Sequence, residues 1–286
     1  MLDVAIPVVF AVFVWWFSTG LILLLDNLPR TTFRWSLVIS SGLALAAFAG
    51  IARTASQEST AAAYCAFTCA LLVWGWHELS FLTGWITGPR KRATPTGASE
   101  PTRFIHAVQA ILWHEIGIIA VGLAIVAVTW GEPNQVGTWT FLVFWIMRTS
   151  AKLNLFLGVR NLSEEFLPAH LKYLASFFRR RAMNLLFPVS VTASTVVAVV
   201  MVQAAVAPGA TPTASAGLML AATMLGLAIL EHWLLVLPLP ATALWRWAMR
   251  RHEDAPTAAP PAVAPAIARP LAPPVDPAEE SLLHAR

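Results

Sequence analysis

Seven long apolar stretches, separated by turn and charge clusters, constrain what this chain can fold into. They cover roughly residues 4–25, 35–52, 61–86, 104–130, 138–159, 184–207 and 215–237. Each is close to the length of about 20 residues that a transmembrane helix needs. Only 12% of the 286 residues are charged, whereas a soluble domain has about 25%. The sequence therefore predicts an all-α, polytopic membrane helix bundle of about seven transmembrane helices over residues 1–250.

The Lys and Arg residues between these stretches lie almost entirely on one side. They follow the first, third, fifth and seventh stretches, whereas Arg53 alone lies in the alternate loops. Loops rich in Lys and Arg face the cytoplasm. This predicts a periplasmic N-terminus and a cytoplasmic C-terminus in a bacterial inner membrane, either cytoplasmic or intracytoplasmic. It also explains the net charge of +4 without nucleic acid, which we exclude as a partner in favour of the lipid bilayer.

Two segments outside the apolar stretches have a composition of their own. Residues 251–286 are rich in Ala and Pro and hold too little apolar surface for a core, which predicts a disordered cytoplasmic tail. Residues 160–183 mix apolar side chains such as Phe166 and Phe177 with a basic run, Arg179 to Arg181. This pattern is typical of an amphipathic helix at the membrane interface, and an ordinary loop helix is the alternative.

Charged residues recur inside the predicted membrane helices as adjacent His and Glu. They are His77 and Glu78 in the third stretch, His114 and Glu115 in the fourth, Arg148, Lys152 and Asn154 in the fifth, and Glu231 and His232 in the seventh. At 1.5 Å per residue, most lie about 10–14 Å from the predicted cytoplasmic end. Because buried charges need partners, we expect one polar layer, with Arg148, Lys152 and Asn154 as partners of the His and Glu residues.

The polar layer allows three interpretations. The three glutamates could form a closed ion network with Arg148, Lys152 and a protonated His. Alternatively, His77, His114 and His232 could ligate iron or another divalent metal, with the glutamates as ligands or supports, although the Glu-x-x-His spacing of helical di-iron proteins is missing. In the third interpretation, one His is an axial ligand of a bacteriochlorophyll or haem. The sequence assigns no catalytic residue.

Several strings resemble one protein family. They read WGWHELSFLTG at 74–84, PNQVGTWTF at 133–141, AKLNLFLGVRN at 151–161 and EHW at 231–233, and together they are similar to the PuhE family of purple and related phototrophic bacteria. The resemblance covers roughly residues 1–250. It implies an inner-membrane protein for assembly of the photosynthetic reaction centre and core light-harvesting complex, through bacteriochlorophyll handling or supply. Implied partners are subunits of these complexes or pigment-synthesis proteins.

Two rival function classes stay open beside a non-enzymatic assembly factor. The first is a membrane metalloenzyme of the oxidase or hydroxylase type, acting on a lipophilic or tetrapyrrole substrate. The second is a proton-coupled transporter in which the glutamates relay protons. The sequence has no phosphate-binding Walker loop and no His-Glu-x-x-His motif, which disfavours ATP-driven transport and zinc-dependent proteolysis.

Overall fold

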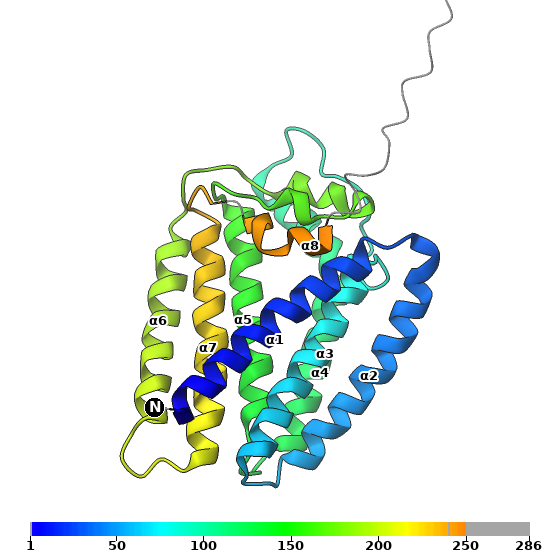
Figure 1. The fold of residues 1–286 in the computed structure, drawn as a ribbon. Coiled ribbons are helices and arrows are strands. Elements are labelled where there is room, and N and C mark those ends of the chain that lie inside the picture. The colour runs from blue at the N-terminus through cyan, green and yellow to red at the C-terminus, as the bar shows by residue number, and fades with distance from the viewer. Residues whose placement is uncertain (1, 240, 250–286) are drawn as a thin grey trace, which may run out of the picture. The chain divides into compact units, whose positions relative to one another are not determined.

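The computed structural model describes residues 2–239 and 241–249, and this part of the chain contains helices and no strand (Figure 1). The predicted all-α class is therefore confirmed. The long helices are α1 (Leu2–Asp26), α2 (Phe33–Thr54), α3 (Thr60–Leu82), α4 (Glu100–Thr129), α5 (Val136–Leu157), α6 (Leu186–Ala205) and α7 (Pro212–Leu234). Short helices are η1 (Arg30–Thr32), η2 (Glu164–Phe166), η3 (Ala169–Phe177), η4 (Ala241–Trp245) and α8 (Arg246–Met249). The predicted tail at 251–286 lies outside the described residues.

Six of these helices are long and apolar enough to cross a membrane, and α5 is not among them. The helix α5 contains Arg148, Lys152 and Asn154, which lower its hydropathy. The other long helices expose large apolar side chains, such as Ile39 of α2, Leu123 of α4 and Val196 of α6. Because a soluble protein would bury such surfaces, the chain is a multi-pass membrane protein.

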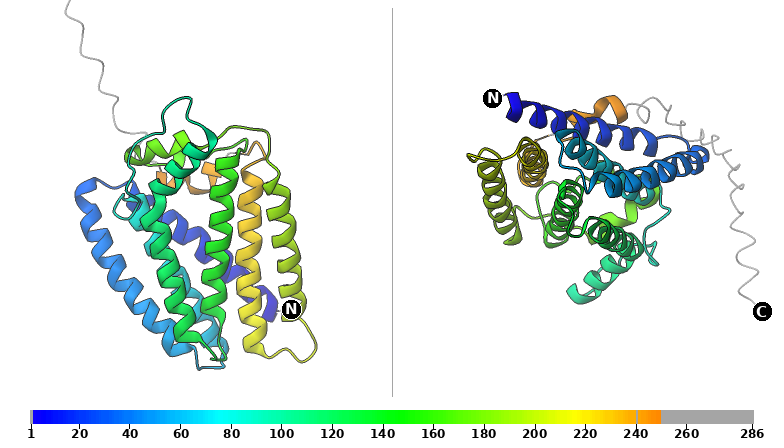
Figure 2. Two further views of the ribbon diagram at one scale, coloured as in Figure 1. Left: turned by 180° about the vertical axis from the view of Figure 1, so that it is seen from behind. Right: turned by 90° about the horizontal axis from the view of Figure 1, so that it is seen from below.

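The helices α3, α5 and α7 pack against one another at the centre of the bundle. Helix α1 crosses α3 and α7 at a steep angle, α2 packs on α3, and α6 packs on α7 (Figures 1 and 2). Small residues allow close approach of these helices, as expected inside membranes. Gly137 of α5, for example, lies against Ile51 of α2 and the backbone of Ala66 in α3.

The connections place one end of every long helix at a common basic end. We use this term for the end at which α1, α3, α5 and α7 finish, and which carries the Arg- and Lys-rich connections. The segment predicted as an amphipathic helix lies here, but it forms η2 and η3 with 3₁₀ geometry. Pro168 precedes η3, and proline disrupts a continuous α-helix because it lacks an N–H and clashes with the preceding turn. The apolar side of η3 still packs on the bundle, where Leu171 and Leu174 contact Phe81 and Ala110.

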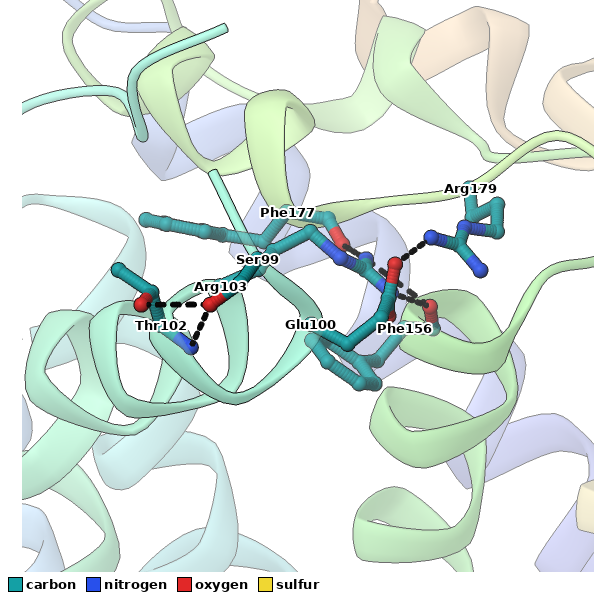
Figure 3. A network of polar contacts seen from close by, with 7 residues as sticks. All are labelled: Ser99, Glu100, Thr102, Arg103, Phe156, Phe177 and Arg179. Atoms are coloured by element: carbon teal, nitrogen blue, oxygen red, sulfur yellow. Dashed lines mark hydrogen bonds and ion pairs between the residues drawn. The ribbon is translucent and has the colours of Figure 1, made fainter. Parts of the chain in front are cut away.

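Arg103 joins three parts of the basic end (Figure 3). Its guanidinium donates to the carbonyl oxygen of Phe156 at 3.1 Å, near the end of α5, and to that of Phe177 at 2.5 Å, at the end of η3. It lies 3.8 Å from the centroid of the Phe156 ring and pairs with Glu100, which also accepts from Arg179. One side chain of α4 thus satisfies carbonyls that α5 and η3 leave open at their ends.

We expect Arg103→Met to lower the free energy of unfolding by about 2 kcal/mol, because buried carbonyls lose charge-assisted hydrogen bonds. Arg92→Met is the matched control, since Arg92 is exposed at the same end. Reversible unfolding in mixed detergent micelles measures both. Equal stability of the two variants would contradict this role of Arg103.

Candidate functional site

Two ion pairs connect the central helix α5 to its neighbours. Arg148 Nη2 lies 3.0 Å from Glu78 Oε2 of α3, and Lys152 Nζ lies 2.5 Å from Glu115 Oε1 of α4. The four-residue spacing of Arg148 and Lys152 places both cations on one face of α5. The structure thus brings four of the predicted charged residues together in pairs that hold α3, α4 and α5 to one another. This matches the ion-network interpretation for these four residues.

His77 of α3 and His114 of α4 are neighbours beside these pairs. Their ring centroids are 6.3 Å apart, and each side chain is only 1% exposed. The His114 ring packs on Phe81 at 4.6 Å between centroids, and the His77 ring packs on Phe141 at 6.2 Å. In the described part of the chain, His77 Nε2 and His114 Nδ1 have no hydrogen-bond partner. Each imidazole therefore keeps a nitrogen available for a proton, a water or a ligand.

Glu231 and His232 of α7 face different surroundings. The indole Nε1 of Trp15 donates to Glu231 Oε1 at 3.1 Å. His232 Nδ1 lies 2.8 Å from the carbonyl oxygen of Ala228, which can only accept, so Nδ1 carries the proton. His232 Nε2 lies 2.9 Å from the Ser150 hydroxyl oxygen. Both nitrogens of His232 thus lie within hydrogen-bond distance of groups of the protein.

The predicted three-histidine metal site gains no support from this geometry. Within residues 2–239 and 241–249, no three His, Cys, Asp or Glu side chains form a group that could hold a metal ion. His77 and His114 lie together, whereas His232 binds Ser150.

Asn154 is not a partner of the charged residues, contrary to the prediction. Its Oδ1 accepts from Asn184 Nδ2 at 3.0 Å, and its Nδ2 donates to the carbonyl oxygen of Ser150 at 3.0 Å. Asn184 Oδ1 in turn accepts from the backbone N–H groups of Leu186 and Phe187, at the start of α6. Asn154 therefore joins the end of α5 to the start of α6, in a neutral network.

On α3, the polar layer lies closer to the basic end than the predicted 10–14 Å. Helix α3 ends at Leu82 instead of 86, because the chain turns at Gly84, whose φ of +80° favours glycine. His77 is then five residues from the helix end, or about 7.5 Å. The loop that follows returns along α4, where the carbonyl oxygen of Thr87 accepts from the backbone N–H of His114 at 2.9 Å.

At the basic end, outside the membrane-spanning helices, the His170 ring lies beside Gly84. Burial, together with the positive charge of Arg30, lowers the pKa of His170 below its usual range. The pKa of Tyr173 is raised by burial. His170 is therefore a neutral part of the packing between η3 and the loop after α3 near pH 7.

Sequence reasoning missed Trp15, Ser150, Ser190 and Asn184 as parts of the polar contacts. Ser150 donates to Ser190 of α6 at 2.9 Å. Two of these residues carry a usable signal. Asn184 directly precedes the apolar run of α6, which is typical of an N-cap. Trp15 lies inside a predicted membrane helix, where the indole N–H needs a hydrogen-bond acceptor.

The fold and the polar layer define a class: a multi-pass membrane helix bundle whose central helices are joined by ion pairs. The chain belongs to a family described as "Protein of unknown function (DUF3623)", whose match covers residues 1–256. A protein of Rhodobacter capsulatus, described as "Uncharacterized 30.4 kDa protein in puhA 5'region", is 42% identical over 247 residues, which are 85% of this chain and 90% of the relative. No solved structure matches the chain.

Proposed function

We propose that this protein is an inner-membrane factor for assembly of the photosynthetic reaction centre and core light-harvesting complex. The observation that carries the proposal is the 42% identical relative from the puhA 5' region, because puhA is a photosynthetic reaction-centre gene and neighbouring genes often serve one process. The resemblance of the strings at 74–84, 133–141, 151–161 and 231–233 to the PuhE family supports the same role.

The membrane placement is part of this proposal. Helix α5 packs against α3, α4, α6 and α7, and its two cations are met by Glu78 and Glu115. It can therefore cross the membrane with the six apolar helices, as a seventh span. Seven spans put the termini on opposite sides, and the Lys- and Arg-rich basic end is then cytoplasmic. Residues 1–250 form the transmembrane domain in this arrangement, and 251–286 form a cytoplasmic tail.

The polar layer serves structure in this proposal, and the outer helix faces serve binding. The ion pairs hold α3, α4 and α5 in register. Helix α6 packs on α7 and α5 and exposes β-branched residues, among them Val189, Val196 and Val200. This face fits the transmembrane helix of a client subunit, because small and β-branched surfaces allow close helix contact in membranes.

Deletion of the gene from its phototrophic host tests the assembly role. We expect a lower yield of the reaction centre and core antenna in membranes, measured by near-infrared absorption and native gels, with no single bacteriochlorophyll precursor accumulating. Complementation with the wild-type gene should restore the yield. Complementation with a Val196→Lys variant should not, whereas Arg92→Met, at the exposed basic end, is the control that should.

Two outcomes would contradict this function. An unchanged core-complex yield in the deletion strain would remove the assembly role. Accumulation of one pigment precursor would instead favour an enzyme of pigment synthesis. Pigment extracts from the same cells separate these outcomes.

A further inference from the structure

A polar cavity lies at the basic end, where the chain after α5 passes the end of α7. Its volume is about 230 Å³. The polar side chains that line it are Asn161, Ser163, Glu164, Glu165 and Arg180. Pockets for drug-sized ligands measure about 300–1,000 Å³, and a single water needs far less than this cavity offers. The cavity therefore fits a small polar group, or the polar head of a larger molecule.

Backbone hydrogen bonds fix the walls of this cavity. The N–H of Asn161 donates to the carbonyl oxygen of Leu235 at 2.9 Å, just after the end of α7. The N–H of Arg181 donates to the carbonyl oxygen of Val159 at 3.0 Å, which holds the segment that carries Arg180 beside the same stretch. Three segments far apart in the sequence are thus joined through their main chains, so the cavity is a fixed feature of the fold.

Opposite charges line the cavity without forming a close pair. Arg180 Nη2 lies 3.8 Å from Glu164 Oε1, beyond the length of about 3.2 Å that limits an ordinary N–H···O bond. Arg180 Nη1 reaches the carbonyl oxygen of Arg160 only at 3.4 Å. The side chains of Arg180 and Glu164 are 69% and 42% exposed, and Glu165 is exposed as well. Strong donors and acceptors therefore remain open to a ligand.

The three charges restrict the kind of ligand. A simple cation would meet the guanidinium of Arg180, and a simple anion would meet two carboxylates, so each would be repelled by a like charge. A ligand with one anionic and one cationic group avoids both conflicts. A phosphate matches the planar fork of Arg180. A primary ammonium has three N–H donors for Glu164 and Glu165.

Apolar side chains at the cavity indicate where such a ligand comes from. Leu234, the last residue of α7, and Leu239 also line the cavity. Leu239 is 52% exposed, and Trp233 beside them in the chain is 41% exposed. Exposed apolar residues and tryptophan at the end of a membrane helix lie where lipid tails meet head groups. A lipid whose head enters the cavity can keep its acyl chains on these side chains.

We propose that this cavity binds the head group of a zwitterionic phospholipid with a primary ammonium, of the phosphatidylethanolamine type. Its phosphate accepts from Arg180, its ammonium donates to Glu164 and Glu165, and its acyl chains lie along the end of α7. This inference goes beyond the proposed function. It needs only the position of the chain in a membrane, so it does not depend on the assembly role that the deletion strain tests.

Titration of the full chain with lipids in detergent micelles, followed by native mass spectrometry, tests the proposal. The probes are the dioleoyl forms of phosphatidylethanolamine, phosphatidylcholine and phosphatidylglycerol. We expect phosphatidylethanolamine to bind at least about tenfold more tightly than the other two. Phosphatidylcholine has the same charges, but its methylated nitrogen has no N–H to donate. Phosphatidylglycerol lacks the cation, although the exposed Arg160 and Arg181 attract anionic lipid to the surface of this end.

Two variants test the two halves of the head group. Glu165→Gln and Arg180→Gln should each weaken the binding of phosphatidylethanolamine about tenfold, equivalent to the loss of one charge-assisted hydrogen bond. Glu58→Gln, exposed at the opposite end, and Arg181→Gln, exposed and outside the cavity lining, are the matched controls and should bind like the wild type. Thermal melting of each variant checks the fold, and either cavity variant keeps the test valid if the other does not fold.

Soluble O-phosphoethanolamine separates the lipid from its free head group. It has the same phosphate and ammonium but no acyl chains, so it should bind at least about tenfold more weakly than the lipid. The proposal is overturned if this compound binds as tightly as the lipid, or if phosphatidylcholine or phosphatidylglycerol binds as tightly as phosphatidylethanolamine. Folded cavity variants that bind phosphatidylethanolamine like the wild type would overturn it as well.

Discussion

Replacing Lys152 with Met is expected to lower the free energy of unfolding by about 3 kcal/mol, because removal of one partner leaves a largely enclosed charge unpaired. Lys152 Nζ lies 2.5 Å from Glu115 Oε1, and the two side chains are only 24% and 23% exposed. Methionine keeps the length and the apolar stem of the lysine, so packing changes little. The loss of stability therefore measures the cost of leaving the Glu115 carboxylate without its cation.

A double-mutant cycle separates the charge effect from other causes. In Lys152→Met with Glu115→Gln, no unpaired charge remains, and we expect the double variant to regain at least half of the lost stability. Lys172→Met is the control, since Lys172 is exposed and donates to a backbone carbonyl of η2. Reversible unfolding in mixed micelles measures the wild type, Lys152→Met, Glu115→Gln, the double variant and the control. If Lys152→Met matched this control, or if the double variant were the least stable, the ion pair would not hold α4 to α5.

The helices could be predicted because apolar length and turn clusters are local properties of the sequence. Each predicted stretch overlaps one long helix, and the largest boundary errors, four residues each, lie at the two ends of the loop after α3. The apolar residues Trp85 and Ile86 extended the predicted stretch to 86, but α3 ends at Leu82. Their backbone N–H groups donate to Ser80, so the chain has already turned. A glycine with positive φ at 84 gives the turn, and hydropathy does not detect it.

Side-chain direction explains which parts of the candidate site could be predicted. Arg148 and Lys152 are four residues apart and share a face, so their spacing predicts two cations that meet carboxylates of neighbouring helices. Asn154 is two residues from Lys152, which is about 200° around an α-helix, so it faces α6 instead. Glu231 and His232 are about 100° apart and likewise face different helices. The partners of these residues depend on packing between helices, which a single sequence does not encode in its spacing.

Gly88 is a second position at which a small change should have a large effect. A Cβ at Gly88 would lie 2.0 Å from the backbone oxygen of Gln109 and 2.6 Å from the carbonyl carbon of Ala110. Neither atom can rotate away, because both belong to the backbone of α4. We expect Gly88→Ala to cost about 3 kcal/mol, the upper range for overpacking, or to displace the loop after α3. Unfolding in mixed micelles and hydrogen exchange of the loop at 83–99 measure the two effects.

The control for Gly88→Ala is Gly226→Ala in α7, where an added Cβ would have no neighbour within 4 Å. Alanine favours a helix over glycine by about 1 kcal/mol, so this variant should be as stable as the wild type or more stable. The backbone N–H of His114 donates to the carbonyl oxygen of Thr87, and its hydrogen-exchange rate gives the decisive signal. If the loop leaves α4 in Gly88→Ala, this N–H should exchange faster while the ion pairs deeper in the bundle persist. Unchanged exchange at His114 together with unchanged stability would show that the loop does not pack on α4, and His114 would then be open to the basic end.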